Sequence, residues 1–162
     1  MNRCFLLLAL CATTLWAGDL TRRAELTGFG GGLHIFDGGD HGVYGGSLGY
    51  GVTSRAQVFA EVSHAPLQGN VNLVDFQGGV KYSLVTHDMF EPYAMAAIGA
   101  GHFSNPVVSS TGFGLSAGFG TRVYVRSNWG VVPDIRWSRY FFDGPDTNTF
   151  RYTVGAFFQW GR

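Results

Sequence analysis

The chain has little cysteine, no net charge and no long apolar run. Its two cysteines, Cys4 and Cys11, both fall within the first 17 residues. Removal of that segment on export would leave no thiol for a disulfide, a thiolate metal site or a cysteine nucleophile. The formal net charge is zero, without the basic excess that a nucleic-acid-binding surface shows. We therefore expect no nucleic-acid partner.

No internal stretch approaches the roughly 20 consecutive apolar residues of a transmembrane helix, yet 46% of the residues are hydrophobic. Glycine is abundant instead, at 25 residues, and aromatic residues make up 15% of the chain. A transmembrane β-barrel resolves this combination, because its apolar residues are spread over alternate positions of many strands.

The first 17 residues have the composition of a secretory signal peptide. Arg3 supplies a positive start, and Cys4–Ala12 form an apolar segment that is too short to span a bilayer. Ala17 ends the segment with the small residue that cleavage favours. We predict a cleaved signal peptide over 1–17, export through the inner membrane, and one mature domain over 18–162.

The segment Gly112–Val125 alternates strictly between two kinds of side chain. One parity is mainly apolar and includes Phe113, Leu115 and Phe119, whereas the other is mainly glycine. A period of two is that of a β-strand with two different faces. Tiny residues opposite an apolar face favour a narrow closed barrel whose outside meets lipid. A soluble lipocalin-like carrier would have the reverse pattern, with polar residues outside.

Strand-like segments of about ten residues or slightly more follow one another along the mature chain. A mature length of roughly 145 residues suits an eight-stranded barrel. The predicted fold is all-β, an eight-stranded antiparallel transmembrane up-and-down barrel. The expected strands are Ala24–His34, Tyr44–Val52, Ala56–His64, Val71–Leu84, Pro92–Phe103, Thr111–Val125, Trp129–Phe142 and Thr149–Trp160.

The outward connections between these strands are short, whereas Val85–Glu91, one of the three even-numbered connections, is longer than a periplasmic turn usually is. With the N-terminus in the periplasm, Thr53–Arg55 and Arg126–Asn128 are periplasmic turns, and the odd-numbered connections face outside. Receptors and adhesins built on such barrels need longer outward loops to present a binding surface. The loop lengths therefore favour a structural role or a small interaction role.

Alternation also places charged residues inside the predicted barrel. Balanced ion pairs are expected there, because an unpaired buried charge would cost several kcal/mol. Two interpretations stay open: a structural polar plug, or a narrow ion-conducting pore gated by exchange of partners. The predicted interior charge network is Glu61, Asp75, Lys81, Arg122, Asp134, Arg136 and Arg151.

Aromatic residues near the strand ends are predicted to face the two membrane interfaces. Trp129 and Trp160 fall at the expected periplasmic ends, and Tyr140 and Phe141 at the outer ends, where aromatic girdles lie. Arg139 has lipid-facing parity near the outer rim, where it would either contact lipopolysaccharide phosphate or be solvated. We expect outer-membrane lipids, including lipopolysaccharide, as partners.

One cluster has a spacing that a metal could use. His34, Asp37, Asp40 and His41 all fall in or beside the first outward connection. Asp-Gly-Gly-Asp is, however, ordinary turn sequence. We predict no metal site and no cofactor.

A second pair could carry acyl-transfer chemistry. His102-Phe103-Ser104-Asn105 resembles the His-x-Ser-Asn motif of the outer-membrane lipid A deacylase, and its histidine and serine share one face of a strand. The motif ends the expected fifth strand here, whereas the deacylase carries it on the penultimate strand. We therefore predict no catalytic residue, and a lipid A-modifying acyl hydrolase using His102 and Ser104 stays an alternative.

Four segments resemble the small outer-membrane β-barrel domain family that includes OmpX and the membrane domain of OmpA. They are Gly49–Thr53, Val58–Ser63, Pro92–Gly101 and Arg151–Trp160. The resemblance implies a barrel in the outer membrane of a Gram-negative bacterium. Because inert anchors, small pores and lipid enzymes share this fold, the role is a separate prediction: a monomer with a structural or interaction role and no enzymatic activity. The resemblance also implies that the barrel assembly machinery recognises the last strand.

Overall fold

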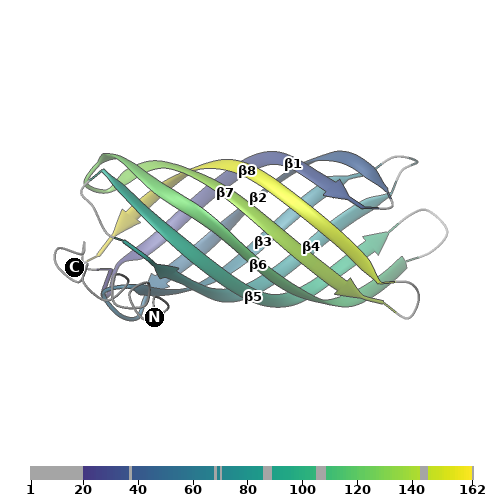
Figure 1. The fold of residues 1–162 in the computed structure, drawn as a ribbon, viewed down its shortest axis with the longest axis horizontal. Helices are drawn as coiled ribbons and strands as arrows, with labels where there is room; N and C mark the ends of the chain where they lie inside the picture. Colours follow the sequence, from purple (N-terminus) through teal and green to yellow (C-terminus); the bar gives the residue numbers. More distant parts are fainter. Residues whose placement is uncertain are drawn as a thin grey trace, which may run out of the picture.

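The computed structural model describes residues 20–36, 38–67, 69, 71–85, 89–104, 109–142 and 146–161. These residues form antiparallel strands that close into one barrel, with each strand paired to its neighbours in sequence order (Figure 1). The predicted eight-stranded barrel is confirmed. The predicted signal peptide falls outside the described residues. No helix in these ranges is long and apolar enough to cross a membrane.

Strand β7 shows how the sequence builds the barrel wall. Its residues alternate between exposed and buried from one end to the other. Ile135 and Trp137 face outward, whereas Asp134 and Arg136 face inward. Apolar side chains outside and charged side chains inside are the arrangement that surrounding lipid favours. The strands are β1 Ala24–Ile35, β2 Gly39–Gly51, β3 Ala56–Pro66, β4 Asn72–Ser83, β5 Phe90–Ser104, β6 Ser109–Arg126, β7 Trp129–Phe141 and β8 Thr147–Trp160.

The barrel closes by pairing its first strand with its last. Ala24 lies opposite Trp160, and Ile35 lies opposite Thr149. Closure removes the sheet edges, whose unpaired N–H and C=O groups would each cost several kcal/mol in hydrocarbon. The start of β1 and the end of β8 therefore share one end of the barrel, the left end in Figure 1. We call this end, with the β2–β3, β4–β5 and β6–β7 connections, the turn end, and the opposite end the loop end.

The first hairpin is longer than predicted. A loop was expected from Ile35 to Val43, but β2 begins at Gly39, which pairs directly with Ile35. Gly39 has a φ of 85°, a left-handed conformation that glycine adopts without steric cost. The tight turn at Gly39 therefore lets the strands continue through the region expected to be a loop.

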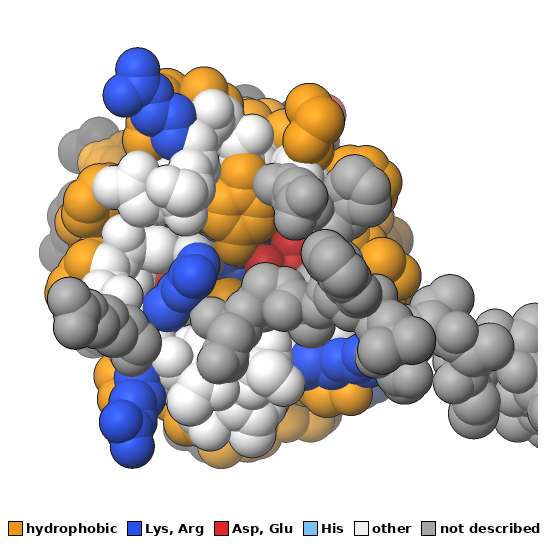
Figure 2. Space-filling view, turned by 90° about the vertical axis from the view of Figure 1, so that its left-hand side faces the viewer, with side chains coloured by type: hydrophobic (Ala, Val, Ile, Leu, Met, Phe, Trp, Pro, Cys, Tyr) orange, Lys and Arg blue, Asp and Glu red, His pale blue; other side chains and the backbone are white. Residues whose placement is uncertain are grey.

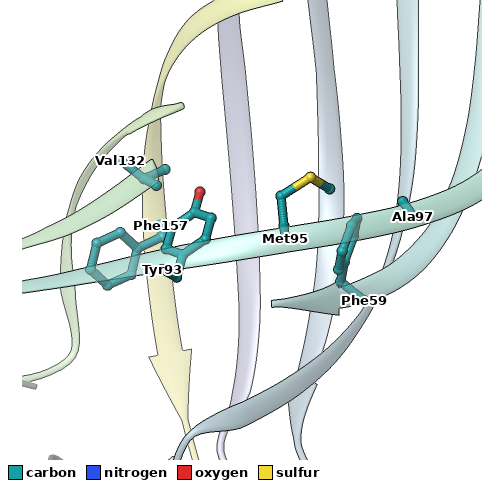
Figure 3. Close-up of a cluster of buried hydrophobic side chains, with 6 residues drawn as sticks. All are labelled: Phe59, Tyr93, Met95, Ala97, Val132 and Phe157. Carbon is teal, nitrogen blue, oxygen red and sulfur yellow. The ribbon is translucent and has the colours of Figure 1, made fainter. Parts of the chain in front are cut away.

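Two apolar clusters fill parts of the interior. One lies in the half of the barrel nearer the turn end, and Figure 3 shows its side chains projecting inward from different strands. The other lies at the loop end. The first consists of Phe59, Tyr93, Met95, Ala97, Val132 and Phe157, and the second of Leu33, Ile35, Val43, Ala65 and Leu73. Polar side chains occupy the space between and beyond these clusters.

Close approach of neighbouring strands explains one glycine directly. A Cβ atom added at Gly79 would lie 2.7 Å from the Cα atom of Ala97, whereas one at Gly78 meets nothing nearer than 3.8 Å. We predict that Gly79→Ala lowers the free energy of unfolding by about 1–3 kcal/mol, because the backbone has to move. Gly78→Ala should stay within about 0.5 kcal/mol of the wild type. Urea unfolding in detergent micelles measures both, and equal stabilities would contradict the prediction.

Candidate functional site

The polar interior at the turn end is organised around Arg122. This side chain is only 1% exposed. Its Nε donates to Glu25 Oε2 at 2.7 Å, its Nη1 to Glu91 Oε1 at 3.0 Å and its Nη2 to Gln57 Oε1 at 2.6 Å. Lys81 Nζ lies 3.5 Å from Glu25 Oε1. Two cations thus face two carboxylates, and we call Glu25, Gln57, Lys81, Glu91 and Arg122 the turn-end cluster.

Further hydrogen bonds hold the two carboxylates of the turn-end cluster. Gln159 Nε2 donates to Glu25 Oε2 at 2.8 Å. The hydroxyls of Ser83 and Tyr124 both donate to Glu91, the latter at 2.9 Å. Several donors therefore replace the water that each carboxylate loses on burial.

Aromatic rings separate the turn-end cluster from the charges deeper in the barrel. Arg122 lies over the ring of Tyr93, with its guanidinium carbon 5.1 Å from the ring centroid. Lys81 Nζ lies 5.2 Å from the Phe59 centroid, and Arg136 reaches the same ring from 5.8 Å. The aromatic rings of the first apolar cluster thus make cation–π contacts with cations of the turn-end cluster on one side and with Arg136 on the other.

A second group of charges, the central cluster, is organised around Glu61. Arg136 binds Glu61 through both terminal nitrogens, at 2.8 and 3.2 Å, and Arg151 Nη2 donates to Glu61 Oε1 at 2.7 Å. Asp134 Oδ1 lies 3.5 Å from Arg136 Nη2, and Asp134 Oδ2 accepts a hydrogen bond from Tyr93 at 2.8 Å. We define the central cluster as Glu61, Asp134, Arg136 and Arg151.

Asp75 lies toward the loop end and is connected to the central cluster through Gln77, whose Oε1 accepts a hydrogen bond from Arg136 Nη1 at 3.0 Å. Gln77 Nε2 donates to Asp75 Oδ2 at 2.7 Å, whereas Asp75 Oδ1 has no hydrogen-bond partner in the part of the chain that the structure describes. Among the described residues, no Lys or Arg forms a salt bridge with Asp75. Within the described ranges, a single neutral amide is therefore the donor to this carboxylate.

The enclosed cavities beside these groups are small. One, of about 20 Å³, adjoins the central cluster, and another, of about 10 Å³, adjoins Asp75 and Tyr140. Each is comparable to the space that a single water molecule needs. Side chains therefore occupy most of the barrel interior.

The structure divides the seven predicted interior residues among these groups. Lys81 and Arg122 lie in the turn-end cluster, four others form the central cluster, and Asp75 belongs to neither; all seven are buried. The sequence interpretation missed Glu25 and Glu91. Glu25 alternates with the outward Leu26, so the parity of β1 could have placed it inside. The expected fifth strand begins at Pro92, one residue after Glu91, whereas β5 begins at Phe90 and includes Glu91.

Tyr140 does not face the membrane interface, contrary to expectation. It is 3% exposed, and a Cβ atom added at Gly101 or Gly114 would lie 2.8 Å from its ring. The physical reason is the parity of β7, which places Tyr140 on the same inward face as Ser138. Trp129, Phe141 and Trp160 point outward, with 40%, 37% and 47% of their surface exposed.

Arg139 has a protein partner at the loop end. Its Nη2 lies 2.7 Å from Asp146 Oδ2, and its guanidinium carbon lies 5.2 Å from the Phe141 ring centroid. These contacts favour a locally paired rim arginine over one directed at a lipid phosphate.

The polar groups considered for chemistry lie outside the interior clusters. His102 Nδ1 is 2.8 Å from Thr111 Oγ1, across the β5–β6 pair, and the hydrogen bonds of the described residues do not join His102 to Ser104. His34 pairs with Asp40 at 2.8 Å, while Asp37 falls outside the described residues. Within the described ranges, no three His, Cys, Asp or Glu side chains converge as metal ligands would.

Comparison with solved structures finds similar small barrels. Neisserial surface protein A matches with a TM-score of 0.72 and 14% identity, over 84% of this chain and 95% of its own. The N-terminal barrel of Pseudomonas aeruginosa OprF matches with a TM-score of 0.63 and 16% identity, over 86% and 98%. The attachment invasion locus protein Ail of Yersinia pestis gives 0.52 and 13%, over 86% and 99%. A comparison with curated protein sequences finds no match.

The family model for the outer membrane protein beta-barrel domain matches residues 4–158. This match spans nearly the whole chain, and it agrees with the closed barrel and its apolar outer face. The chain therefore belongs to the outer membrane protein β-barrel domain family.

Proposed function

We propose that this protein is a monomeric outer-membrane barrel that acts as a structural or interaction element, with its charged interior serving as a rigid plug. The observation that carries the proposal is the packing of the interior. Charged side chains pair across the barrel at hydrogen-bonding distance, and the enclosed cavities beside them are each comparable to one water molecule. An interior filled with paired charges favours a structural plug over an ion-conducting pore.

The arrangement of the apolar clusters also supports a plug. An ion crossing the barrel would pass the second apolar cluster at the loop end, which includes Leu33, Ile35 and Leu73. It would then have to displace Glu61 from two arginines at once. Each obstacle adds a desolvation cost, so conduction is disfavoured.

Planar-bilayer recording tests the plug directly. We expect the purified barrel to show no discrete conductance steps above background, and Glu61→Ala to show none either, because the apolar clusters remain in place. A large general porin, recorded in the same bilayers, controls for detection. Steady unit currents in the wild type that change in size with Glu61→Ala would overturn the plug and favour the pore.

Membrane insertion is tested separately. The folded barrel should fractionate with the outer membrane and migrate faster on gels before heating than after, as a closed sheet that resists detergent does. Recovery as a water-soluble monomer without detergent would contradict the proposal.

We also propose that a signal peptide over 1–17 directs export and that the barrel assembly machinery inserts the chain. Loss of insertion after depletion of that machinery would support the second step.

A further inference from the structure

The outward face of the barrel carries a groove of about 560 Å³ across β5, β6, β7, β8 and β1. Phe119, Ile135 and Tyr152 form one side of it, and each is about half exposed or more. Pro133 and Gly30 lie in its floor. The volume falls within the range of small-molecule sites.

Local backbone chemistry explains why the wall is hollowed here. The β6–β7 pairing runs from Gly120 opposite Asp134 to Val123 opposite Val131, and the positions between these pairs are not matched. Pro133 lies in this interval and has no N–H to donate to the ladder. Gly30 then leaves the outer surface of β1 without a side chain, so the depression continues across the β8–β1 pair.

The groove runs from the rim of the turn end toward the middle of the barrel. It begins at Leu84 and Pro92, which lie where β4 ends and β5 starts. It ends at Gly30, midway along β1. A groove with this path extends from one membrane interface toward the bilayer centre, as an acyl chain does.

Arginines lie around the rim of the turn end, and Arg126 ends β6, the strand that pairs with the start of β5. Arg22, Arg23, Arg55 and Arg126 lie at the turn end, and none forms a salt bridge with a described carboxylate. Figure 2 looks onto this end and shows Lys and Arg side chains at several places around its rim. The Arg55 carbonyl accepts a hydrogen bond from Ser83 at 2.8 Å, next in sequence to Leu84 at the mouth of the groove. Arginine at a membrane interface pairs readily with phosphate.

We propose that the groove and these arginines together bind one anionic phospholipid of the leaflet at the turn end. One acyl chain occupies the groove, and the headgroup phosphate contacts the rim at Arg55 and Arg126. The proposal rests on the proposed function, because it requires the barrel to span a bilayer. Charge complementarity and the path of the groove favour this occupant over a second copy of the chain.

The groove is tested by filling it. Gly30→Phe places a ring in the groove, and Gly78→Phe is its matched control. Both glycines face outward, and a Cβ atom at either meets nothing nearer than 3.8 Å, but Gly78 lies outside the groove. Each barrel is reconstituted in nanodiscs of phosphatidylglycerol and phosphatidylcholine, and native mass spectrometry counts the lipids retained. We expect the wild type and Gly78→Phe to retain one phosphatidylglycerol, and Gly30→Phe to retain at least fivefold less.

The arginines are tested by the same readout. Arg55→Gln with Arg126→Gln should reduce the preference for phosphatidylglycerol over phosphatidylcholine by about fivefold for each charge removed. Arg139→Gln, at the opposite end, should leave the preference unchanged. Equal retention of the two lipids by the wild type would overturn the proposal, and so would equal retention by Gly30→Phe and Gly78→Phe.

The oligomeric state and the folding of each variant are measured on the same samples. If the wild-type barrel forms a dimer and Gly30→Phe dissociates it, the groove binds a second copy of the chain. That result would overturn the proposal that a phospholipid occupies the groove. Gel mobility before heating reports folding on the same samples, and Gly30→Leu replaces Gly30→Phe if the larger side chain prevents folding. A barrel that fails to insert contradicts the proposed function, whereas a folded barrel without lipid preference contradicts only this inference.

Discussion

Arg122→Ala is expected to lower the free energy of unfolding by about 3–5 kcal/mol. The substitution removes the guanidinium that binds both Glu25 and Glu91 and leaves those carboxylates buried, each only 2% exposed. Lys81, at 3.5 Å from Glu25, compensates only in part. Urea unfolding of the barrel in detergent micelles, followed by gel mobility and tryptophan fluorescence, measures the loss.

Two comparisons distinguish the cost of leaving buried carboxylates unpaired from the cost of removing any arginine. Arg126→Ala, on the exposed end of the same strand, should change the free energy of unfolding by less than about 0.5 kcal/mol. Combining Arg122→Met and Lys81→Met with Glu25→Gln and Glu91→Gln should recover much of the loss, because no charged side chain is then left in the turn-end cluster. A loss below about 1 kcal/mol in Arg122→Ala would mean that the turn-end cluster contributes little.

Glu61→Ala should produce a second loss of about 3–5 kcal/mol. Glu61 binds both Arg136 and Arg151. Its removal leaves two buried cations, of which only Arg136 keeps a described carboxylate within salt-bridge distance, Asp134 at 3.5 Å. Glu61→Gln should lose less, because the amide oxygen still accepts a hydrogen bond from one arginine. The same urea titration measures both variants.

An exposed ion pair supplies the control for Glu61. Asp40→Ala removes a carboxylate that pairs with His34 at 2.8 Å, but Asp40 is 78% exposed. Exposed pairs contribute about 0–1 kcal/mol, so this variant should unfold near the wild type. Equal losses in Glu61→Ala and Asp40→Ala would contradict the role given to burial.

The strands and the facing of most side chains could be predicted from the sequence because a period of two is a local property. In β7, residues two positions apart lie on the same face of the strand. The polar or apolar character of these neighbours therefore indicates whether a side chain points inward or outward. The position of Tyr140 near a strand end predicts an interface residue, whereas its parity predicts an inward side chain, and the parity is correct. The same local rule, applied to β1 and to the start of β5, would have found Glu25 and Glu91.

The partners of each buried charge could not be predicted in the same way. Arg122 lies 97 residues from Glu25 in sequence, and Arg151 lies 90 residues from Glu61. Which of these side chains meet depends on the stagger of every strand around the barrel. The groove at Pro133 could not be predicted from the sequence either, because it is formed by outward residues of several strands.

Closure of β8 onto β1 has a consequence for the order of events in biogenesis. The residues that complete the sheet, Thr149 to Trp160, are synthesised after the other strands of the barrel, yet they pair with its first strand. Until they arrive, β1 has a free edge, and contacts this distant in sequence form slowly. We therefore expect the chain to be kept unfolded while it crosses the periplasm, and to fold in one cooperative step rather than hairpin by hairpin during synthesis.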